Sequence, residues 1–408
     1  MEIIGIIAEY NPFHNGHLYQ IKKTRQMTQC DAVVAVMSGH FSQRGEATIT
    51  NKFTRTKMAL ENGIDLVIEL PALVATASAE RFAQGAVSLL NQAQIITQLS
   101  FGSECGNIQL LNDIAHVLIT ETSTIDHFIK FYLKQGLSYP QSRQKALVEC
   151  LSQYAHTHYS SLIETLQSPN NILGIEYIKA LRLSHSAILP FTIHRQGGGY
   201  HDTTLTHSLA SASAIRKALY HSDSNYQNSL PPSSMRYLKH ITLPSMENLS
   251  SFLHYKLMFS CASDLYATWD VPEDLIRTLC KASLNRPSYR ELVQQGTSKT
   301  YSKSTVQRSL LRLLLEGKTS MISTFSPILE VPYIRVLGCK KTHTWLLKLL
   351  VEQATIPVIT NLSRQYDTLS AYQKSWLDYE CKATRLYAYA THLPELAQSD
   401  FTHPFITL

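Results

Sequence analysis

Two histidines three residues apart, His14 and His17, lie in the segment 9–17 (EYNPFHNGH), directly after an apolar run. Residues at this spacing share one face of a helix, so both imidazoles would lie on the first turn of a helix that starts here. A helix N-terminus has free amide groups and a positive dipole end, which together favour a phosphate. Two imidazoles at that place can donate hydrogen bonds to phosphate oxygens that gain charge during nucleotidyl transfer. We therefore predict that His14 and His17 are catalytic.

Other chemically capable residues also follow apolar runs. Gly102, in FGSE (101–104), would let an adenosine lie against the backbone, although a simple turn is the alternative. Arg195 follows the run 188–193 and precedes three glycines (197–199) that could fold over phosphates. Arg44 could bind a carboxylate or a phosphate, and a solvated loop arginine fits its position equally well.

The elements that position these residues are predicted from apolar periodicity. Strands are expected at 3–8, 32–37, 66–70, 95–101 and 188–193, and helices at 51–61, 79–91 and 172–183. Strands that alternate with helices predict a doubly wound α/β domain with a parallel sheet. Ligands of such sheets bind beyond the carboxyl ends of the strands, which is where the residues above lie.

The second half of the chain differs in character. Residues 221–234 (HSDSNYQNSLPPSS) are polar and linker-like, and helical patterns such as 304–315 and 345–353 follow them. We predict two domains, a nucleotide-binding α/β catalytic domain at 1–220 and a mainly α-helical domain at 235–408.

Positive charge is concentrated in the second domain. Of the 37 Lys and Arg residues, nine lie between Val271 and Lys318, where only four Asp and Glu residues oppose them. Tyr289 and Tyr301 are interleaved and could stack on unpaired bases. A basic patch of this kind fits an RNA backbone, and a solvated helical surface is the alternative. The predicted RNA-binding residues are Lys299, Lys303, Arg308 and Arg312.

Composition excludes several protein classes. The 408 residues are 44% hydrophobic, which is too apolar for a disordered chain, and no run approaches the roughly 20 apolar residues of a membrane span. The N-terminus has no leader-like pattern, so we expect a cytoplasmic protein that does not bind membranes. The seven cysteines form no CxxC pair, and neither a disulfide framework nor a protein-built metal site is expected.

Several segments together resemble one known family. The segment 11–17 is similar to the HxGH signature of the nucleotidyltransferase superfamily, whose members transfer adenylate from ATP. The wider sequence resembles the bacterial tRNA(Met) cytidine acetate ligases through GIIAEYNPFHNGHLYQ (5–20), VMSGHFSQRGE (36–46), DLVIELP (65–71), FGSE (101–104), SPNNILGIEYIKAL (168–181), SASAIRKAL (211–219) and VPYIRVLG (331–338).

The resemblance implies an ATP site. Its residues would be Ile7, Ala8, Glu9, Tyr10, Asn11, Pro12, Phe13, His14, Asn15, Gly16, His17, Leu18, Tyr19 and Gln20, joined by Gly102, Asn170, Arg195, Ser213 and Arg216. The segment 211–216 resembles the second superfamily motif, Ile-Ser-Ser-Thr-x-x-Arg, but has Ala214 at the fourth position. This departure leaves open whether Ser211 or Ser213 faces the phosphates.

The resemblance also implies a two-step ligase reaction. Acetate and ATP would give acetyl-adenylate, and the wobble cytidine of elongator tRNA(Met) would then take the acetyl group to form N4-acetylcytidine. Mg²⁺ would accompany ATP, and no stable protein partner is implied. Two alternatives remain, an adenylyltransferase acting on a small phosphorylated acceptor and a non-catalytic RNA-binding protein.

Overall fold

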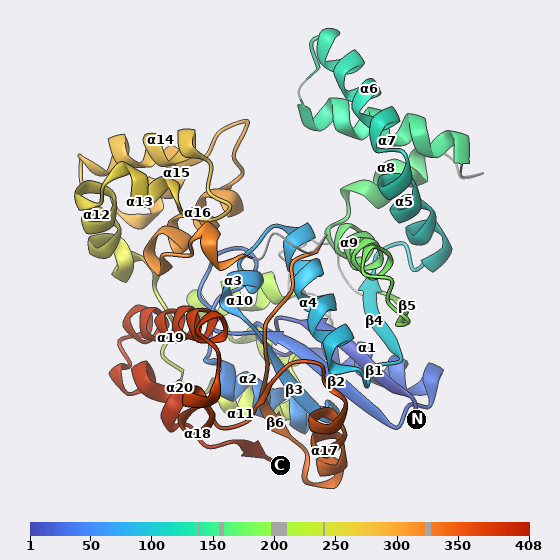
Figure 1. Cartoon of the computed structure of the whole chain (residues 1–408), viewed down its shortest axis with the longest axis vertical. Coiled ribbons are helices and arrows are strands. Elements are labelled where there is room, and N and C mark those ends of the chain that lie inside the picture. The colour runs from blue at the N-terminus through green and yellow to red at the C-terminus, as the bar shows by residue number, and fades with distance from the viewer. Residues whose placement is uncertain (138, 155–158, 197–209, 240, 323–327) are drawn as a thin grey trace.

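The computed structural model describes residues 1–137, 139–154, 159–196, 210–239, 241–322 and 328–408 (Figure 1). One sheet runs through the molecule. Its strands are β1 (Ile3–Ala8), β2 (Ala32–Ser38), β3 (Leu66–Leu70), β4 (Gln98–Ser103), β5 (Leu189–His194), β6 (Ile334–Cys339), β7 (Val358–Ile359) and β8 (Ile406–Thr407). All five strands predicted in the first half are present. β4 begins later than expected because Ile95 and Ile96 pack into the core ahead of the strand.

The strand order places a crevice beside β1. The order is β5-β4-β1-β2-β3-β6-β7, with β8 paired to β6, and β1 to β5 are parallel neighbours. From β1 the chain moves outward to β2 and β3, then crosses back to add β4 on the other side of β1. Such a reversal separates the loops that follow β1 and β4. The crevice between these loops is the usual ligand position in open parallel sheets. The predicted doubly wound α/β class is confirmed.

β2 and β3, at the centre of the sheet, are buried on both faces, and this explains why they are apolar at successive positions. Side chains alternate between the faces with a period of two residues. In β2, Val34 and Val36 pack into one core with α4 (Ala79–Ala93) and α9 (Pro169–Leu183). Val33 and Ala35 pack into a second core with α1 (Asn15–Thr28) and α2 (Lys52–Glu61).

Helices cover the sheet and extend beyond it. In the first half they are α1 (Asn15–Thr28), α2 (Lys52–Glu61), α3 (Ala72–Ala75), α4 (Ala79–Ala93), α5 (Ile108–Thr120), α6 (Thr122–Lys134), α7 (Tyr139–Tyr154), α8 (Tyr159–Gln167), α9 (Pro169–Leu183) and α10 (Ala212–Tyr220). In the second half they are α11 (Pro232–Leu238), α12 (Ser250–Phe259), α13 (Ala262–Tyr266), α14 (Glu273–Ser283), α15 (Tyr289–Gly296), α16 (Lys303–Leu315), α17 (Thr344–Gln353), α18 (Leu362–Gln365), α19 (Ala371–Thr391) and α20 (Ser399–Thr402). In Figure 1, α12 to α16 form a group on one side of the sheet and α5 to α8 an arm on the other. Within the described ranges, no helix is both long and apolar enough to span a bilayer.

The second half is not a separately packed helical unit. β6 pairs antiparallel with β3, and β7 and β8 both pair with β6, so this half extends the sheet of the first. The expected domains at 1–220 and 235–408 therefore do not pack as two separate units, because they share one sheet. As a division of function, with ATP bound by one part and tRNA by the other, they stay a prediction.

The segment 221–234 is not an extended linker either. It contains a short 3-10 helix (Ser224–Ser229), and Leu230 is buried in the core that also holds α2. The Asn62 amide at the end of α2 donates to the Ser233 hydroxyl at 2.7 Å. Its polar composition reflects solvent exposure, since most of its polar side chains between His221 and Asn228 are exposed.

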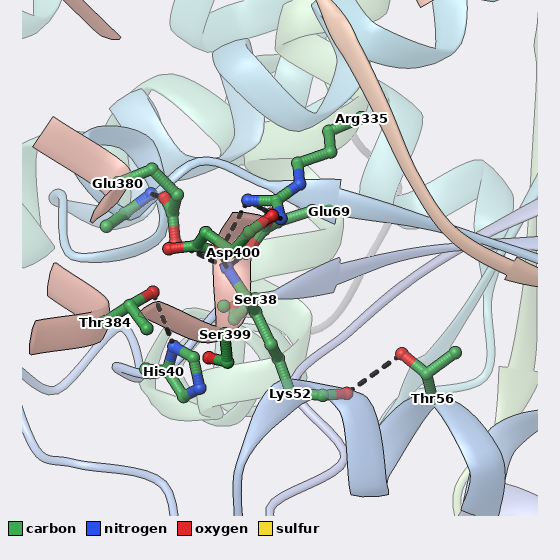
Figure 2. Close-up of polar contacts among 12 residues, drawn as sticks. Ser38, His40, Lys52, Thr56, Glu69, Arg335, Glu380, Thr384, Ser399 and Asp400 are labelled. Carbon is green, nitrogen blue, oxygen red and sulfur yellow. Dashed lines mark hydrogen bonds and ion pairs between the residues drawn. The ribbon is translucent and has the colours of Figure 1, made fainter. Parts of the chain in front are cut away.

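Five buried ionisable side chains join the C-terminal helices to the sheet (Figure 2). Lys52 Nζ lies 2.5 Å from Glu69 Oε1 and 2.7 Å from Asp400 Oδ1, and a longer contact of 3.5 Å reaches Glu380. Arg335 pairs with Glu69 at 3.1 Å and with Asp400 at 2.7 Å. The second Glu380 oxygen accepts the Ala72 amide at 2.5 Å. These residues come from α2, β3, β6, α19 and α20, so the cluster spans both halves of the chain.

We expect Lys52→Met to destabilise the fold. The change removes one of the two cations that pair with the buried Glu69 and Asp400 carboxylates, and breaking a buried pair in this way costs about 3–5 kcal/mol. Urea unfolding measures the loss. The matched control is Lys348→Met, whose side chain is 80% exposed and should leave the urea midpoint unchanged. Equal midpoints for the two variants would contradict a stabilising cluster.

Glu380 should make stability depend on pH. Burial raises the pKa of this carboxyl from 4.5 to about 8, and the nearby Glu69 carboxylate adds to the rise. Between those two values the folded chain holds a proton that the unfolded chain releases, so stability falls as pH rises from 4.5 to about 8 and levels off above it. Glu380→Gln removes this contribution, of up to about 1.4 kcal/mol per pH unit. Urea midpoints measured across the interval should show a shallower slope for the variant, and identical slopes would contradict the assignment.

Candidate active site

A cavity of about 360 Å³ opens at the carboxyl ends of β1 and β4, in the crevice that the strand order predicts. Ile7 and Ala8 come from the end of β1, and Gly102 comes from β4. Residues after β2 and β5 complete that side, and the starts of α9 and α10 close the other. The volume lies within the range of small-molecule sites.

The two histidines form the cap of α1. His14 is the N-cap residue, and its Nδ1 accepts the Gly16 amide at 3.0 Å. His17 Nδ1 accepts the backbone amide of His14 at 3.2 Å, which completes a reciprocal capping box. The rings are stacked with centroids 3.8 Å apart, and both line the cavity. Since both Nδ1 atoms accept hydrogen bonds, each neutral ring carries its proton on Nε2.

The surroundings keep both rings neutral. Burial lowers the pKa of His14 to about 3, and the positive charges of Arg195 and Arg216 add to this effect. Burial also lowers the pKa of His17 well below 6.5, and the neighbouring His14 and Arg195 contribute further. Each ring can therefore donate its Nε2–H to an anion near neutral pH while remaining uncharged.

Arg216 reaches the cavity from α10. Its guanidinium donates to the Asn11 carbonyl at 2.8 Å and to the Ser213 hydroxyl oxygen at 3.2 Å. Ser211 is the N-cap of α10 and accepts the Ala214 amide at 3.1 Å. Both serines line the cavity, but their roles differ. Ser211 caps the helix, and Ser213 is the hydrogen-bond partner of Arg216. The Asn11–Pro12 peptide bond is cis.

The start of α9 is fastened to the loop after β4. Glu104 accepts the Asn170 side-chain amide at 2.6 Å and the Asn171 backbone amide at 2.9 Å. In return, Asn171 Oδ1 accepts the backbone amides of Glu104 and Cys105. Asn170 therefore lines the cavity with its side chain fixed by Glu104.

Gly102 has a packing role that the sequence did not indicate. A Cβ atom at this position would lie 3.2 Å from Cγ of Arg195, so the glycine lets the arginine stem pass over the strand end. Arg195 lines the cavity from the segment after β5. The three glycines that follow it, 197–199, lie outside the described residues.

Most of the predicted ATP-binding residues line the cavity. Those that do so are Ile7, Ala8, Glu9, Tyr10, Asn11, His14, His17, Gln20, Gly102, Asn170, Arg195, Ser213 and Arg216. Pro12, Phe13, Asn15, Gly16, Leu18 and Tyr19 are not among the lining residues. Phe13 packs in the core, and Gly16 acts through its amide on His14.

The apolar wall was missed by the sequence analysis. Phe82 of α4, Phe101 of β4, and Leu173 and Tyr177 of α9 line the cavity and offer a surface for a flat ring. The available signal was the spacing along α9, because Asn170, Leu173 and Tyr177 recur every three to four residues on one face.

The predicted RNA-binding residues divide into two groups. Lys299 and Lys303 are exposed, and Arg308 is half-buried. Arg312 is only 1% exposed: it donates to the carbonyls of Thr76 and Trp269 and lies over the Trp269 ring at 4.4 Å. The prediction that Arg312 binds RNA is therefore wrong, because its guanidinium fastens α16 to the first half of the chain.

Of the two interleaved tyrosines, Tyr289 is not an open stacking surface. Tyr289 is only 5% exposed, and the Tyr301 hydroxyl donates to the Asp274 carboxylate at 2.7 Å. Elsewhere, α12 and α19 carry exposed aromatic side chains, with Tyr255 and Phe259 as the most open.

The chain was compared with known proteins. The model of a family described as HIGH Nucleotidyl Transferase matches residues 1–401. A tRNA(Met) cytidine acetate ligase of Clostridium perfringens is 39% identical over 401 residues, 95% of either chain. One of a Thermoanaerobacter species is 37% identical over 414 residues and covers 100% of both chains.

Solved structures agree with these sequence relatives. The apo crystal structure of Thermotoga maritima TmcAL superposes with a TM-score of 0.89 at 30% identity, and 100% of both chains is covered. A second structure of that protein, bound with alpha-thio ATP, gives a TM-score of 0.87 at 29% identity. On this full-length agreement, the chain belongs to the tRNA(Met) cytidine acetate ligase family of HIGH nucleotidyltransferases.

Proposed function

We propose that this chain is an ATP-dependent ligase that activates acetate and transfers the acetyl group to the wobble cytidine of elongator tRNA(Met). The observation that carries the proposal is the pair of neutral imidazoles at the start of α1, facing a cavity that Arg195 and Arg216 also line. The relative from Thermotoga maritima binds alpha-thio ATP, which supports assigning ATP to this cavity. The full-length match to the ligases favours this function over a small-acceptor adenylyltransferase or a non-catalytic RNA-binding protein.

In the first step, an acetate oxygen attacks the α-phosphorus of ATP, and the bond to the bridging oxygen of pyrophosphate breaks. Such displacements depend on positioning and on stabilising the charge at the phosphoryl oxygens. The Nε2–H groups of His14 and His17 are suited to the α-phosphate, and Arg195 and Arg216 to the remaining phosphates. The apolar wall of Phe82, Leu173 and Tyr177 is suited to adenine.

In the second step, the N4 amine of cytidine attacks the acetyl carbon of acetyl-adenylate. The carbon–nitrogen bond forms, AMP leaves with the electron pair of the broken C–O bond, and the amine loses a proton. The product is N4-acetylcytidine. The tRNA substrate is found in the cytoplasm, where we expect the enzyme to act.

The cavity fits Mg²⁺ only as a companion of ATP. Within the described residues, no group of three or more His, Cys, Asp or Glu side chains could hold a metal ion. Among the lining residues that the structure describes, Glu9 is the one carboxylate, and it accepts the Gln43 amide at 2.6 Å. Mg²⁺ commonly binds through one carboxylate, water and the substrate phosphates. Bound in that way, it would neutralise phosphate charge, with Glu9 as its protein ligand.

A direct assay tests the proposal. The protein is incubated with ATP, labelled acetate and total tRNA, and the digested tRNA is examined for labelled cytidine. We expect N4-acetylcytidine to form with acetate plus ATP and not with acetyl-CoA alone. Labelling from acetyl-CoA without ATP would identify an acetyltransferase and refute the ligase.

His14→Asn should separate catalysis from folding. Asparagine is a good N-cap residue, so the start of α1 keeps an acceptor for the Gly16 amide, but the Nε2–H donor is lost. Removing one such donor typically lowers the rate by about 10²–10³-fold. Acetate-dependent exchange of pyrophosphate into ATP should fall by that factor, while the thermal midpoint and tRNA affinity stay near those of the unaltered protein. His116→Asn, an exposed change on α5, is the control, and full exchange activity in His14→Asn would contradict the role of His14.

Lys299 and Lys303 provide a test of RNA binding. Reversing both charges with Lys299→Glu and Lys303→Glu should weaken tRNA binding. It should also flatten the salt dependence, by about 0.7–0.9 in the log–log slope for each phosphate that the protein no longer neutralises. Lys348→Glu on α17 is exposed and should change neither quantity beyond a general charge effect. Filter binding at several salt concentrations measures both. An unchanged slope would place the RNA surface elsewhere.

A further inference from the structure

A second cavity, of about 410 Å³, lies between α15 and α16. The mechanism above does not use it. It is lined by Tyr289, Arg290, Val293, Gln294, Thr297, Lys303 and Gln307.

The loop after β2 connects the second cavity to the first. Gln43 and Arg44 line the first cavity. At Gly45, which has a φ of +75°, a Cβ atom would lie 2.5 Å from the backbone nitrogen of Arg308, so the loop packs directly on α16. Glu46 Oε1 then accepts the side-chain amide of Gln307 at 3.0 Å, and Gln307 lines the second cavity. One four-residue stretch therefore contributes to the first cavity and contacts the wall of the second.

Electrostatic interactions show the same adjacency. Burial lowers the pKa of Arg216 in the first cavity, and the carboxylates of Glu9 and Glu46 oppose this change. Burial raises the pKa of Tyr289 in the second cavity, and the charge of Glu46 adds to the rise. Glu46 thus acts on a residue of each cavity.

The lining of the second cavity suits a nucleotide. Arg290 and Lys303 are exposed cations, and no carboxylate is among the described residues of the lining. Val293 and the small exposed part of Tyr289 form an apolar floor, and the side chains of Gln294 and Thr297 can hydrogen-bond to a base edge. The Tyr289 hydroxyl is buried beside Gln307 and makes no hydrogen bond of normal geometry in the described structure. The cations can bind the phosphate of a nucleotide, and the apolar and amide groups can contact the face and the polar edge of its base.

We infer that this second cavity receives an unpaired nucleotide of the tRNA, one that neighbours the cytidine whose base enters the first cavity. The inference rests on the proposed function, because that function places an RNA loop at the first cavity. Nucleotides on either side of a wobble cytidine are unpaired, so one of them can turn out of the loop and be held across the 43–46 wall. The cavity would then help to select the tRNA through a base other than the one acetylated.

The test uses two adjacent glutamines. Gln294 lines the cavity, and Gln295 is exposed on the same helix without lining it. We expect Gln294→Trp to fill the cavity and weaken tRNA binding about tenfold, within the range for one stacked base. Gln295→Trp should bind tRNA normally, and both variants should keep full acetate-dependent pyrophosphate exchange. If Gln294→Trp binds tRNA as tightly as Gln295→Trp, or more tightly, the inference is overturned.

A change on the RNA side completes the test. The base of each nucleotide flanking the target cytidine is removed in turn. One abasic tRNA should bind the unaltered protein about tenfold more weakly but should cost the Gln294→Trp variant nothing further. Equal losses for both proteins would overturn the inference. If the unaltered protein fails to acetylate tRNA from acetate and ATP, the proposed function fails and takes this inference with it. Normal acetylation by Gln294→Trp overturns this inference alone.

Discussion

The arrangement of the molecule depends on the buried charges that meet beneath the loop after β2. Lys52 and Arg335 face Glu69, Glu380 and Asp400, drawn from segments at both ends of the sequence. Burying charges costs so much solvation that such clusters add little net stability, but they penalise every arrangement that separates the partners. Here the separated arrangement would be one in which α19 and α20 leave the sheet. The loop after β2 packs directly on this cluster, because a Cβ atom at Gly39 would lie 2.7 Å from Glu380 and 2.9 Å from Glu69.

At the cavity, the same atoms meet a folding requirement and a chemical one. The first amides of α1 need acceptors, and the Nδ1 atoms of His14 and His17 supply them. That use of Nδ1 fixes the proton of each ring on Nε2, and burial keeps the ring uncharged. A neutral donor suits a site already flanked by two arginines, since two further positive charges stacked 3.8 Å apart would repel each other whenever the nucleotide is absent. The capping box therefore prepares the site for an anion before one binds.

The sequence predicted the sheet and the site better than the second half, for physical reasons. The central strands β2 and β3 are buried on both faces, and the polar segments that follow the first-half strands lie at the ligand edge, so local pattern carries most of the information. β6 is a short apolar run whose partner, β3, lies far away in the sequence, and no local pattern specifies that pairing. Arg312 was misread because a charge count treats every cation as solvated. Its neighbours Leu311 and Leu313 are buried, and an arginine between them can be buried as well when backbone carbonyls receive its donors.

A two-step reaction needs one site that is reached by two substrates of very different size. The walls formed by α4 and α9 suit the nucleotide. Another wall of the cavity is formed by the 43–46 loop, which contacts α16. Exposed Lys303 is the first residue of that helix, and exposed Lys299 lies in the segment just before it. The loop is short and its contacts are specific, with Glu9 holding the Gln43 amide on one side and Gln307 holding Glu46 on the other. Because both contacts act on one four-residue stretch, this loop joins α16 directly to the residues that line the nucleotide cavity.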